Sequence, residues 1–277
     1  PGEDITIGKS ANILPASLIL ERDVKFTRCV TAVLHCGGVT FIGKDGGGID
    51  QVDAQGNVLH FIGQGGGTIS SIKQYNDLLL VLKPGSPYNL SQYNLDGNVV
   101  AYNSPQGSSC TYASQMVVVK NSVIVADRYR RKLNIHSVNG LTLLKSVVCD
   151  SIPTCGYFSI AALGEDSLIF ASEKGGTFTV NRHSGQVTWT SSHKFKDTAA
   201  VAFNEETVLL SGSNNYESNS DVLVKALNIK TGKCKVMTLG GCCSGLKGFR
   251  LIIDTRFEEL RIVSQDLRFI RIPEGSA

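Results

Sequence analysis

The sequence is poor in charged residues: only 18% of its 277 residues are Asp, Glu, Lys or Arg, against about 25% in typical soluble domains. The net charge of +3 is weak, so electrostatic binding must depend on where the charges lie. No apolar run reaches the roughly 18 residues of a membrane-spanning helix, and no basic start precedes an apolar segment. We therefore expect no signal peptide and no membrane partner. We also expect a cytoplasmic location, with nuclear and secreted locations left open.

Cysteine pairs of the C-x-x-C type are absent although the chain has eight cysteines, which excludes zinc sites built on that motif. Cys29, Cys110 and Cys234 lie in or beside apolar strands, so we interpret the cysteines as reduced thiols. Cys149 and Cys155 flank a short loop, and a disulfide between them stays open. The five histidines fall in unrelated strand and turn positions and predict neither a metal cluster nor a histidine-based catalytic triad.

Glycine is abundant, with 29 residues, and it marks a repeat. Five turn sequences precede strand-like runs: "DAQGNVLHFIG", "NLDGNVVAYN", "SVNGLTLL", "RHSGQVTWT" and "IKTGKCKVMT". Their glycines are Gly56, Gly97, Gly140, Gly185 and Gly232, which are separated by 41, 43, 45 and 47 residues. A period near this length with four short strands in each unit predicts a β-propeller.

The second strand of each unit is almost entirely apolar: "GVTFIG", "DLLLVLK", "SVIVAD", "SLIFAS", "TVLLSG" and "ELRIVS". Continuous apolar strands are buried on both faces, as expected for the inner strands of blades packed between neighbouring blades. The units show no 3.6-residue periodicity that would indicate helices. The pattern therefore predicts an all-β fold.

The predicted blades span residues 30–67, 68–113, 114–158, 159–198, 199–247 and 248–277. The last unit supplies only three strands, whereas the segment 15–29 contains the strand-like run "ASLILERD" without a unit of its own. We therefore predict a single domain over residues 1–277: a six-bladed β-propeller closed by an N-terminal strand that completes the last blade (a 3+1 clasp). Closure also removes exposed sheet edges.

The stretch "VIVADRYRRKLNIHSVNG" resembles the NHL repeat, in which an apolar strand is followed by Ala-Asp, a basic loop, an amphipathic strand and a glycine turn. The resemblance covers about one unit of six. It implies a propeller of the type found at the C-terminus of TRIM-family proteins, where it binds RNA or protein. The blade length is shared with WD-repeat proteins, and "VNRHSGQVTW" and "ALNIKTGKCK" are similar to turns of quinoprotein-type blades. These resemblances imply the fold and a binding role.

Connectivity divides the loops of a propeller between two faces. Loops from second to third strands and loops between blades share one face, and the remaining turns share the other. The first face gathers cations with aromatic residues among them, which suit an acidic peptide, phosphates or stacked bases. These predicted partner-binding residues are Lys44, Lys83, Tyr88, Arg128, Tyr129, Arg130, Arg131, Lys132, Lys174, His193, Lys194, Lys196, Tyr216 and Lys247. The other face receives Asp77, Glu165, Asp166, Glu205, Glu206, Glu258 and Glu259.

Enzymatic chemistry is not indicated. The glycine runs "GKDGGGID" and "GQGGGTIS" connect strands instead of opening a helix, so neither a phosphate loop nor a cofactor is predicted. A calcium site in the pore would need acids or Asn from several blades, and of the inner-strand ends only Asp127 and Glu173 qualify.

We therefore predict a non-enzymatic scaffold whose loop-rich basic face binds a protein or peptide partner. An RNA-binding propeller of NHL type is the first alternative, and a calcium-dependent propeller hydrolase is the second. No catalytic, metal-binding or cofactor-binding residue is predicted. The partner's identity and the oligomeric state stay open.

Overall fold

The computed structural model describes residues 19–23, 30–36, 38–53, 55–62, 67–84, 89–103, 115–154, 158–172, 176–191, 196–202, 206–213, 222–239, 250–254, 259–263 and 268–271. All regular elements in these ranges are β-strands joined by turns. Within the same ranges, no helix is long and apolar enough to cross a membrane. The predicted all-β class is therefore confirmed.

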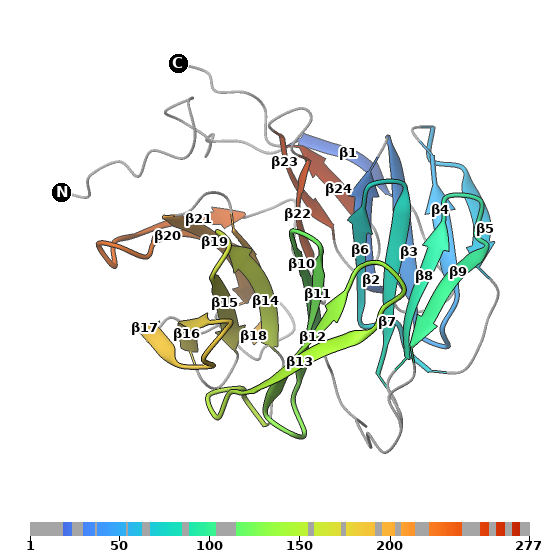
Figure 1. Ribbon diagram of the computed structural model, residues 1–277. Coiled ribbons are helices and arrows are strands. Elements are labelled where there is room, and N and C mark those ends of the chain that lie inside the picture. Colours follow the sequence, from blue (N-terminus) through green and yellow to red (C-terminus); the bar gives the residue numbers. More distant parts are fainter. Residues whose placement is uncertain are drawn as a thin grey trace. The chain divides into compact units, whose positions relative to one another are not determined.

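The strands form four-stranded antiparallel sheets that fall into two compact units (Figure 1). The β2–β13 unit holds three sheets and the turn Arg182–Gln186. Its strands are β2 (Val30–Cys36), β3 (Val39–Lys44), β4 (Ile49–Val52), β5 (Val58–Ile62), β6 (Ser71–Tyr75), β7 (Leu78–Lys83), β8 (Asn89–Asn94), β9 (Val99–Asn103), β10 (Gln115–Val119), β11 (Ser122–Asp127), β12 (Lys132–Ser137) and β13 (Leu143–Val148).

The β14–β24 unit holds the other three sheets, one of which includes β1. Its strands are β1 (Ile19–Asp23), β14 (Phe158–Leu163), β15 (Ser167–Ser172), β16 (Gly176–Asn181), β17 (Val187–Ser191), β18 (Lys196–Ala202), β19 (Thr207–Ser213), β20 (Val222–Asn228), β21 (Cys234–Leu239), β22 (Arg250–Asp254), β23 (Glu259–Val263) and β24 (Arg268–Arg271). Five sheets in the two units pair four consecutive strands, and in the sixth the order is β1-β24-β23-β22.

The first strands of the sheets begin close to the residues at which the sequence repeats begin. Units were expected to begin near residues 30, 68, 114, 159, 199 and 248, and the strands β2, β6, β10, β14, β18 and β22 begin at Val30, Ser71, Gln115, Phe158, Lys196 and Arg250. The predicted second strands coincide with β3, β7, β11, β15, β19 and β23. In β3, β7, β11 and β15 every residue between the two strand ends is buried. This confirms that continuous apolar runs mark strands covered on both faces.

The repeated glycine turns each join the third and fourth strands of a sheet. Gly56, Gly97, Gly140, Gly185 and Gly232 all have positive φ, between 70° and 88°, a conformation that glycine adopts without a steric penalty. In three of these turns an Asx side chain also accepts backbone N–H groups: Asp53, Asn94 and Asn228. The predicted turn chemistry is thus confirmed at all five positions.

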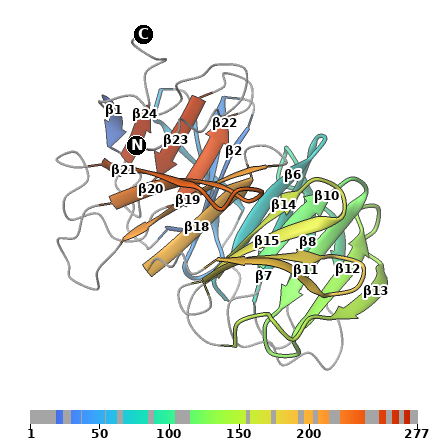
Figure 2. The same cartoon turned by 90° about the vertical axis from the view of Figure 1, so that its left-hand side faces the viewer.

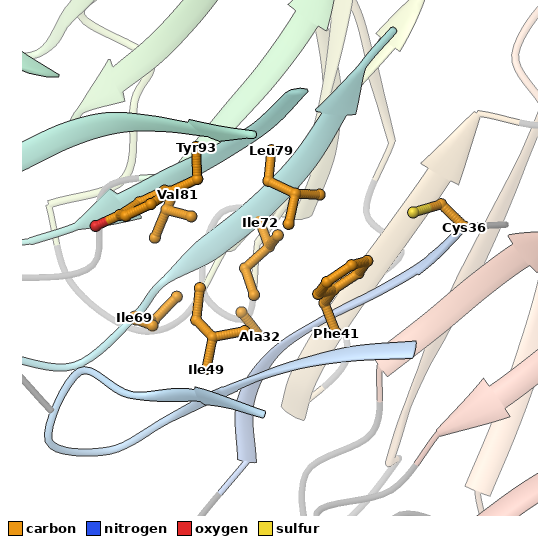
Figure 3. Close-up of a cluster of buried hydrophobic side chains, with 9 residues drawn as sticks. All are labelled: Ala32, Cys36, Phe41, Ile49, Ile69, Ile72, Leu79, Val81 and Tyr93. Atoms are coloured by element: carbon orange, nitrogen blue, oxygen red, sulfur yellow. The ribbon is translucent and has the colours of Figure 1, made fainter. Parts of the chain in front are cut away.

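Apolar clusters join neighbouring sheets inside each unit. In the β2–β13 unit, β6 packs between β2 and β10. Figure 3 shows Phe41 and Ile49 of the first sheet facing Ile72, Leu79 and Val81 of the second. A further cluster joins the sheets β6–β9 and β10–β13. In the β14–β24 unit, β18 packs between β14 and β22 (Figure 2), and a third cluster joins the sheets β14–β17 and β18–β21.

The described cysteines form no disulfides with one another. Cys36 and Cys149 are buried and Cys234 is half-buried. Cys155 lies outside the described residues, so the structure provides no pairing for Cys149. Burial raises the pKa of the Cys149 and Cys234 thiols, and a raised pKa makes a thiol less reactive.

Candidate functional site

The arginine turn, Arg128–Arg131, connects β11 to β12 and holds the densest group of predicted site residues. The side chain of Asp127 is fully buried, and its Oδ1 accepts the backbone N–H of Arg130 at 3.0 Å. At the other end of the turn, the backbone N–H of Cys149 donates to the Arg131 carbonyl oxygen at 2.7 Å. Both contacts fix the backbone of the turn, so its side chains project from a rigid support.

The arginine turn is also accessible. Tyr129 is 70% exposed, and Arg130 and Arg131 are exposed, whereas Arg128 and Lys132 are half-buried. Arg131 adopts a left-handed backbone conformation with φ of 51°. The structure therefore brings together five predicted residues, Arg128 to Lys132, around one turn.

Lys44 and Lys83 occupy the corresponding strand ends of the two preceding sheets, but neither is an exposed cation. Lys44 is only 9% exposed, and its Nζ donates to Oδ1 of Asp50 at 2.7 Å. Nδ1 of His60 lies 3.0 Å from the same Asp50 oxygen. Lys83 is half-buried, and burial lowers the pKa of its ammonium group. The ammonium group of Lys44 therefore forms an ion pair with Asp50 of its own sheet.

The other predicted residues are not described to the same extent. Tyr88, Lys174, His193, Lys194, Tyr216 and Lys247 lie outside the described residues, and Lys196 lies in β18 without a described side chain. On the predicted acidic face, Asp77, Glu165 and Asp166 are exposed, and Glu206 forms an ion pair with Lys230. Glu205 and Glu258 lie outside the described residues, as does Glu173, whereas Glu259 begins β23.

The histidines and acidic residues of the described ranges do not cluster. Among those residues, no group of three or more His, Cys, Asp or Glu side chains is placed to hold a metal ion. His136 is fully buried, with its Nδ1 3.1 Å from the Leu141 carbonyl oxygen. Burial lowers the pKa of this histidine, so it is a neutral side chain of the core.

A second turn, which the sequence did not assign to this site, contacts the C-terminal end of β13, next to the arginine turn. The Arg182 turn, Arg182–Gln186, joins β16 to β17 and belongs to the β2–β13 unit. A Cβ atom at Gly185 would lie only 1.8 Å from the carbonyl oxygen of Val148, the last residue of β13. Nζ of Lys145 also donates to the His183 carbonyl oxygen at 3.2 Å. The Arg182 turn therefore rests directly on β13.

Connectivity alone would place the Arg182 turn on the face opposite the arginine turn. However, Val148 pairs with Lys132, the residue that follows the arginine turn. The end of β13 thus brings two arginine-bearing turns together. The sequence carries no signal that sets Gly185 apart, because Gly140 and Gly232 occupy equivalent turns with similar positive φ and make no such contact with the described residues.

Comparisons with known proteins identify the fold. No protein family model matches the sequence, and no curated protein matches it significantly. Solved structures do match. The WD40 β-propeller domain of Doa1 has 13% identity and a TM-score of 0.64 over 94% of this chain and 98% of that chain. A chain of the Mitotic Checkpoint Complex has 12% identity and a TM-score of 0.60 over 95% and 78%.

The computationally designed Ika8 protein has 12% identity and a TM-score of 0.54, over 87% of this chain and 70% of that chain. At these identities the likeness concerns the fold. The expected resemblance to propeller repeat proteins is therefore confirmed: the chain has an all-β propeller fold similar to that of WD40 domains.

Proposed function

We propose that this chain is a non-enzymatic scaffold domain that binds a protein or peptide partner through its basic loops. The observation that carries the proposal is the arginine turn, in which exposed cations and Tyr129 project from a backbone fixed by Asp127 and Cys149. Arginine and tyrosine on a rigid support are frequent anchors of protein interfaces. The similarity to WD40 domains supports the same use because rigid propellers often serve as binding platforms.

We further propose that the four-stranded sheets are the six blades of one closed propeller. The pairing of β1 with β24 supports this proposal: Ile19 lies opposite Arg271, and Asp23 lies opposite Arg268. This pairing joins the N-terminal strand to the three strands at the end of the chain, as a 3+1 clasp requires. We also propose a reducing, cytoplasmic location, which is supported by the buried thiol of Cys149, since Cys149 forms no disulfide with another described residue.

The test is affinity capture from a cell extract with the chain and two variants. The Arg130→Ala/Arg131→Ala variant removes exposed cations of the arginine turn. Lys120→Ala is the matched control, because Lys120 is also exposed and also has φ of 51°, but lies in the turn at the other end of the sheet. We expect proteins that resist nuclease treatment to be retained by the control and lost by the double variant.

The NHL-type alternative gives a different outcome in the same design. If the partner is RNA, capture disappears with nuclease, and a labelled single-stranded RNA pool binds with steep salt dependence, with a slope of about 0.7 per neutralised phosphate. Equal capture by the double variant and the control would refute a role of the arginine turn in binding, whether the partner is a protein or an RNA.

A further inference from the structure

Two separate turns converge on the C-terminal end of β13 and carry arginines there. The arginine turn is held to this end by the bond from the Cys149 N–H to the Arg131 carbonyl. The Arg182 turn is held there by the close approach of Gly185 to the Val148 carbonyl and by the Lys145–His183 bond. All of these residues belong to the β2–β13 unit, so their proximity is a property of that unit alone.

Buried polar atoms without hydrogen bonds lie in the same two turns and at the end of β11, which leads into the arginine turn. Among the described residues, such side-chain atoms are Asp127 Oδ2, Arg128 Nε and Arg182 Nε. Buried polar groups in proteins are almost always hydrogen-bonded, and each exception needs an explanation. Here the exceptions are two donors in the two turns that meet at β13 and one acceptor at the end of β11. A ligand that offers both acceptors and donors would satisfy all three.

Between the two turns lies an exposed apolar side chain. Val148 is 56% exposed although it directly precedes the buried Cys149. Farther along β13, Leu144 is 62% exposed and forms a β-bulge opposite Ile135 and His136. A bulge interrupts the regular edge that an added strand would need. A partner bound here would therefore contact side chains instead of extending the sheet.

We propose that the arginine turn, the end of β13 and the Arg182 turn form one binding surface for an acidic, extended peptide segment of a partner protein. The guanidinium groups of Arg128 and Arg182 turn outward by rotamer changes and bind carboxylates of the peptide. An apolar residue between those carboxylates covers Val148. This inference rests on the proposed scaffold function and specifies the chemistry of the partner.

The buried carboxylate of Asp127 favours a peptide over a nucleic acid backbone. A peptide supplies carboxylates and carbonyl oxygens for Arg128 and Arg182, and it also supplies N–H donors for a carboxylate. Phosphodiester groups supply only acceptors and carry negative charge, which the Asp127 carboxylate repels. The combination of two arginines, one carboxylate and an exposed valine therefore fits a short acidic segment with an apolar residue.

The test is selection from a library of short random peptides on the full chain, followed by affinity measurements of the selected peptides by fluorescence anisotropy. We expect the selected peptides to be enriched in Asp and Glu around an apolar residue. Arg128→Ala and Arg182→Ala should each weaken binding roughly tenfold or more, because each removes a charge-assisted contact. Arg182→Lys should weaken it as well, since lysine keeps the charge but lacks the planar fork. Lys120→Ala is again the control.

A stability readout separates binding roles from structural ones. Arg128→Ala and Arg182→Ala remove a buried donor that has no hydrogen bond in the free protein, so neither should lower the melting temperature. A structural arginine would lower it. Unfolding of either variant would overturn the inference. Arg182→Lys changes the side-chain volume little and tests separately whether binding needs the planar guanidinium group of Arg182.

The outcomes distinguish this inference from the proposed function. Weaker binding by Arg128→Ala together with unchanged binding by Arg182→Ala would keep the scaffold function and refute the two-turn surface. Selected peptides without acidic residues, or no selected peptide at all, would also refute the surface. Unchanged binding by both variants, combined with equal extract capture by the Arg130→Ala/Arg131→Ala variant, would refute both proposals.

Discussion

Replacement of Gly185 by alanine tests the contact on which the two-turn surface depends. A Cβ atom at Gly185 would lie 1.8 Å from the Val148 oxygen and 2.9 Å from its carbonyl carbon. These are backbone atoms, which cannot rotate away as a flexible side chain does. Gly140 occupies the equivalent turn of the preceding sheet with nearly the same φ, 72° against 74°, but no atom of the described residues lies within 4 Å of its Cβ position. A comparison of Gly185→Ala with Gly140→Ala therefore separates the effect of the contact with Val148 from the effect of the left-handed backbone conformation.

The expected losses in the free energy of unfolding follow from the backbone conformation and from the contact with Val148. Both substitutions place an L-residue in the left-handed region, which costs roughly 1–2 kcal/mol. Gly185→Ala adds overpacking against β13, typically roughly 1–3 kcal/mol, so its total is roughly 2–5 kcal/mol. Gly97→Ala should fall between the two, because its Cβ would lie 2.9 Å from the Phe61 carbonyl oxygen. We therefore expect the destabilisation by alanine to increase in the order Gly140, Gly97, Gly185.

Urea denaturation monitored by circular dichroism measures these changes as shifts of the midpoint at constant slope. Gly232→Ala is a second control, since its Cβ position is also open and its φ is 70°. Equal destabilisation by Gly185→Ala and Gly140→Ala would show that the Arg182 turn does not rest on Val148. In that case the two-turn surface would have no structural basis.

Three further predictions concern buried polar groups of the β2–β13 unit. Asp50→Asn leaves the buried Lys44 ammonium without its ion-pair partner and should lower the free energy of unfolding by about 3–5 kcal/mol in urea titrations; a change below that of a typical surface substitution would contradict the pairing. Burial lowers the pKa of His136, so the unfolded chain takes up a proton that the folded protein does not. The free energy of unfolding should therefore fall as pH drops through about 6.5, and His136→Gln should flatten that dependence in urea titrations at several pH values. Burial also raises the pKa of Cys149, so mass spectrometry should find its thiol alkylated much more slowly in the folded protein than in urea, and equal rates would contradict the burial.

The sequence predicted the strands and the turns well because their signals are local. Apolar runs such as "SVIVAD" and turn glycines such as Gly140 depend on burial and on backbone conformation within a few residues. The predicted positions therefore coincide with β11 and with the turns of positive φ in the structure. The exposed arginine turn was also predictable, since charges that follow a buried strand mark a loop. The burial of Lys44 was not predictable, because its partner Asp50 becomes a neighbour only when β3 pairs with β4.

The Arg182 turn shows why connectivity does not by itself assign a residue to a face. Chain order states at which end of its own sheet a turn lies, and by that criterion the turn between β16 and β17 is opposite to the arginine turn. Successive strands, however, are rotated by about 20–25°, so over three pairings the fourth strand is turned by roughly 60–75° from the first. The end of an outer strand such as β13 can then meet a turn from the other end of the next sheet. Gly185 against Val148 and Gly97 against Phe61 are two instances of this contact. A binding surface on outer strands therefore combines loops that chain order separates, and for this reason the two arginine-bearing turns both contact the end of β13.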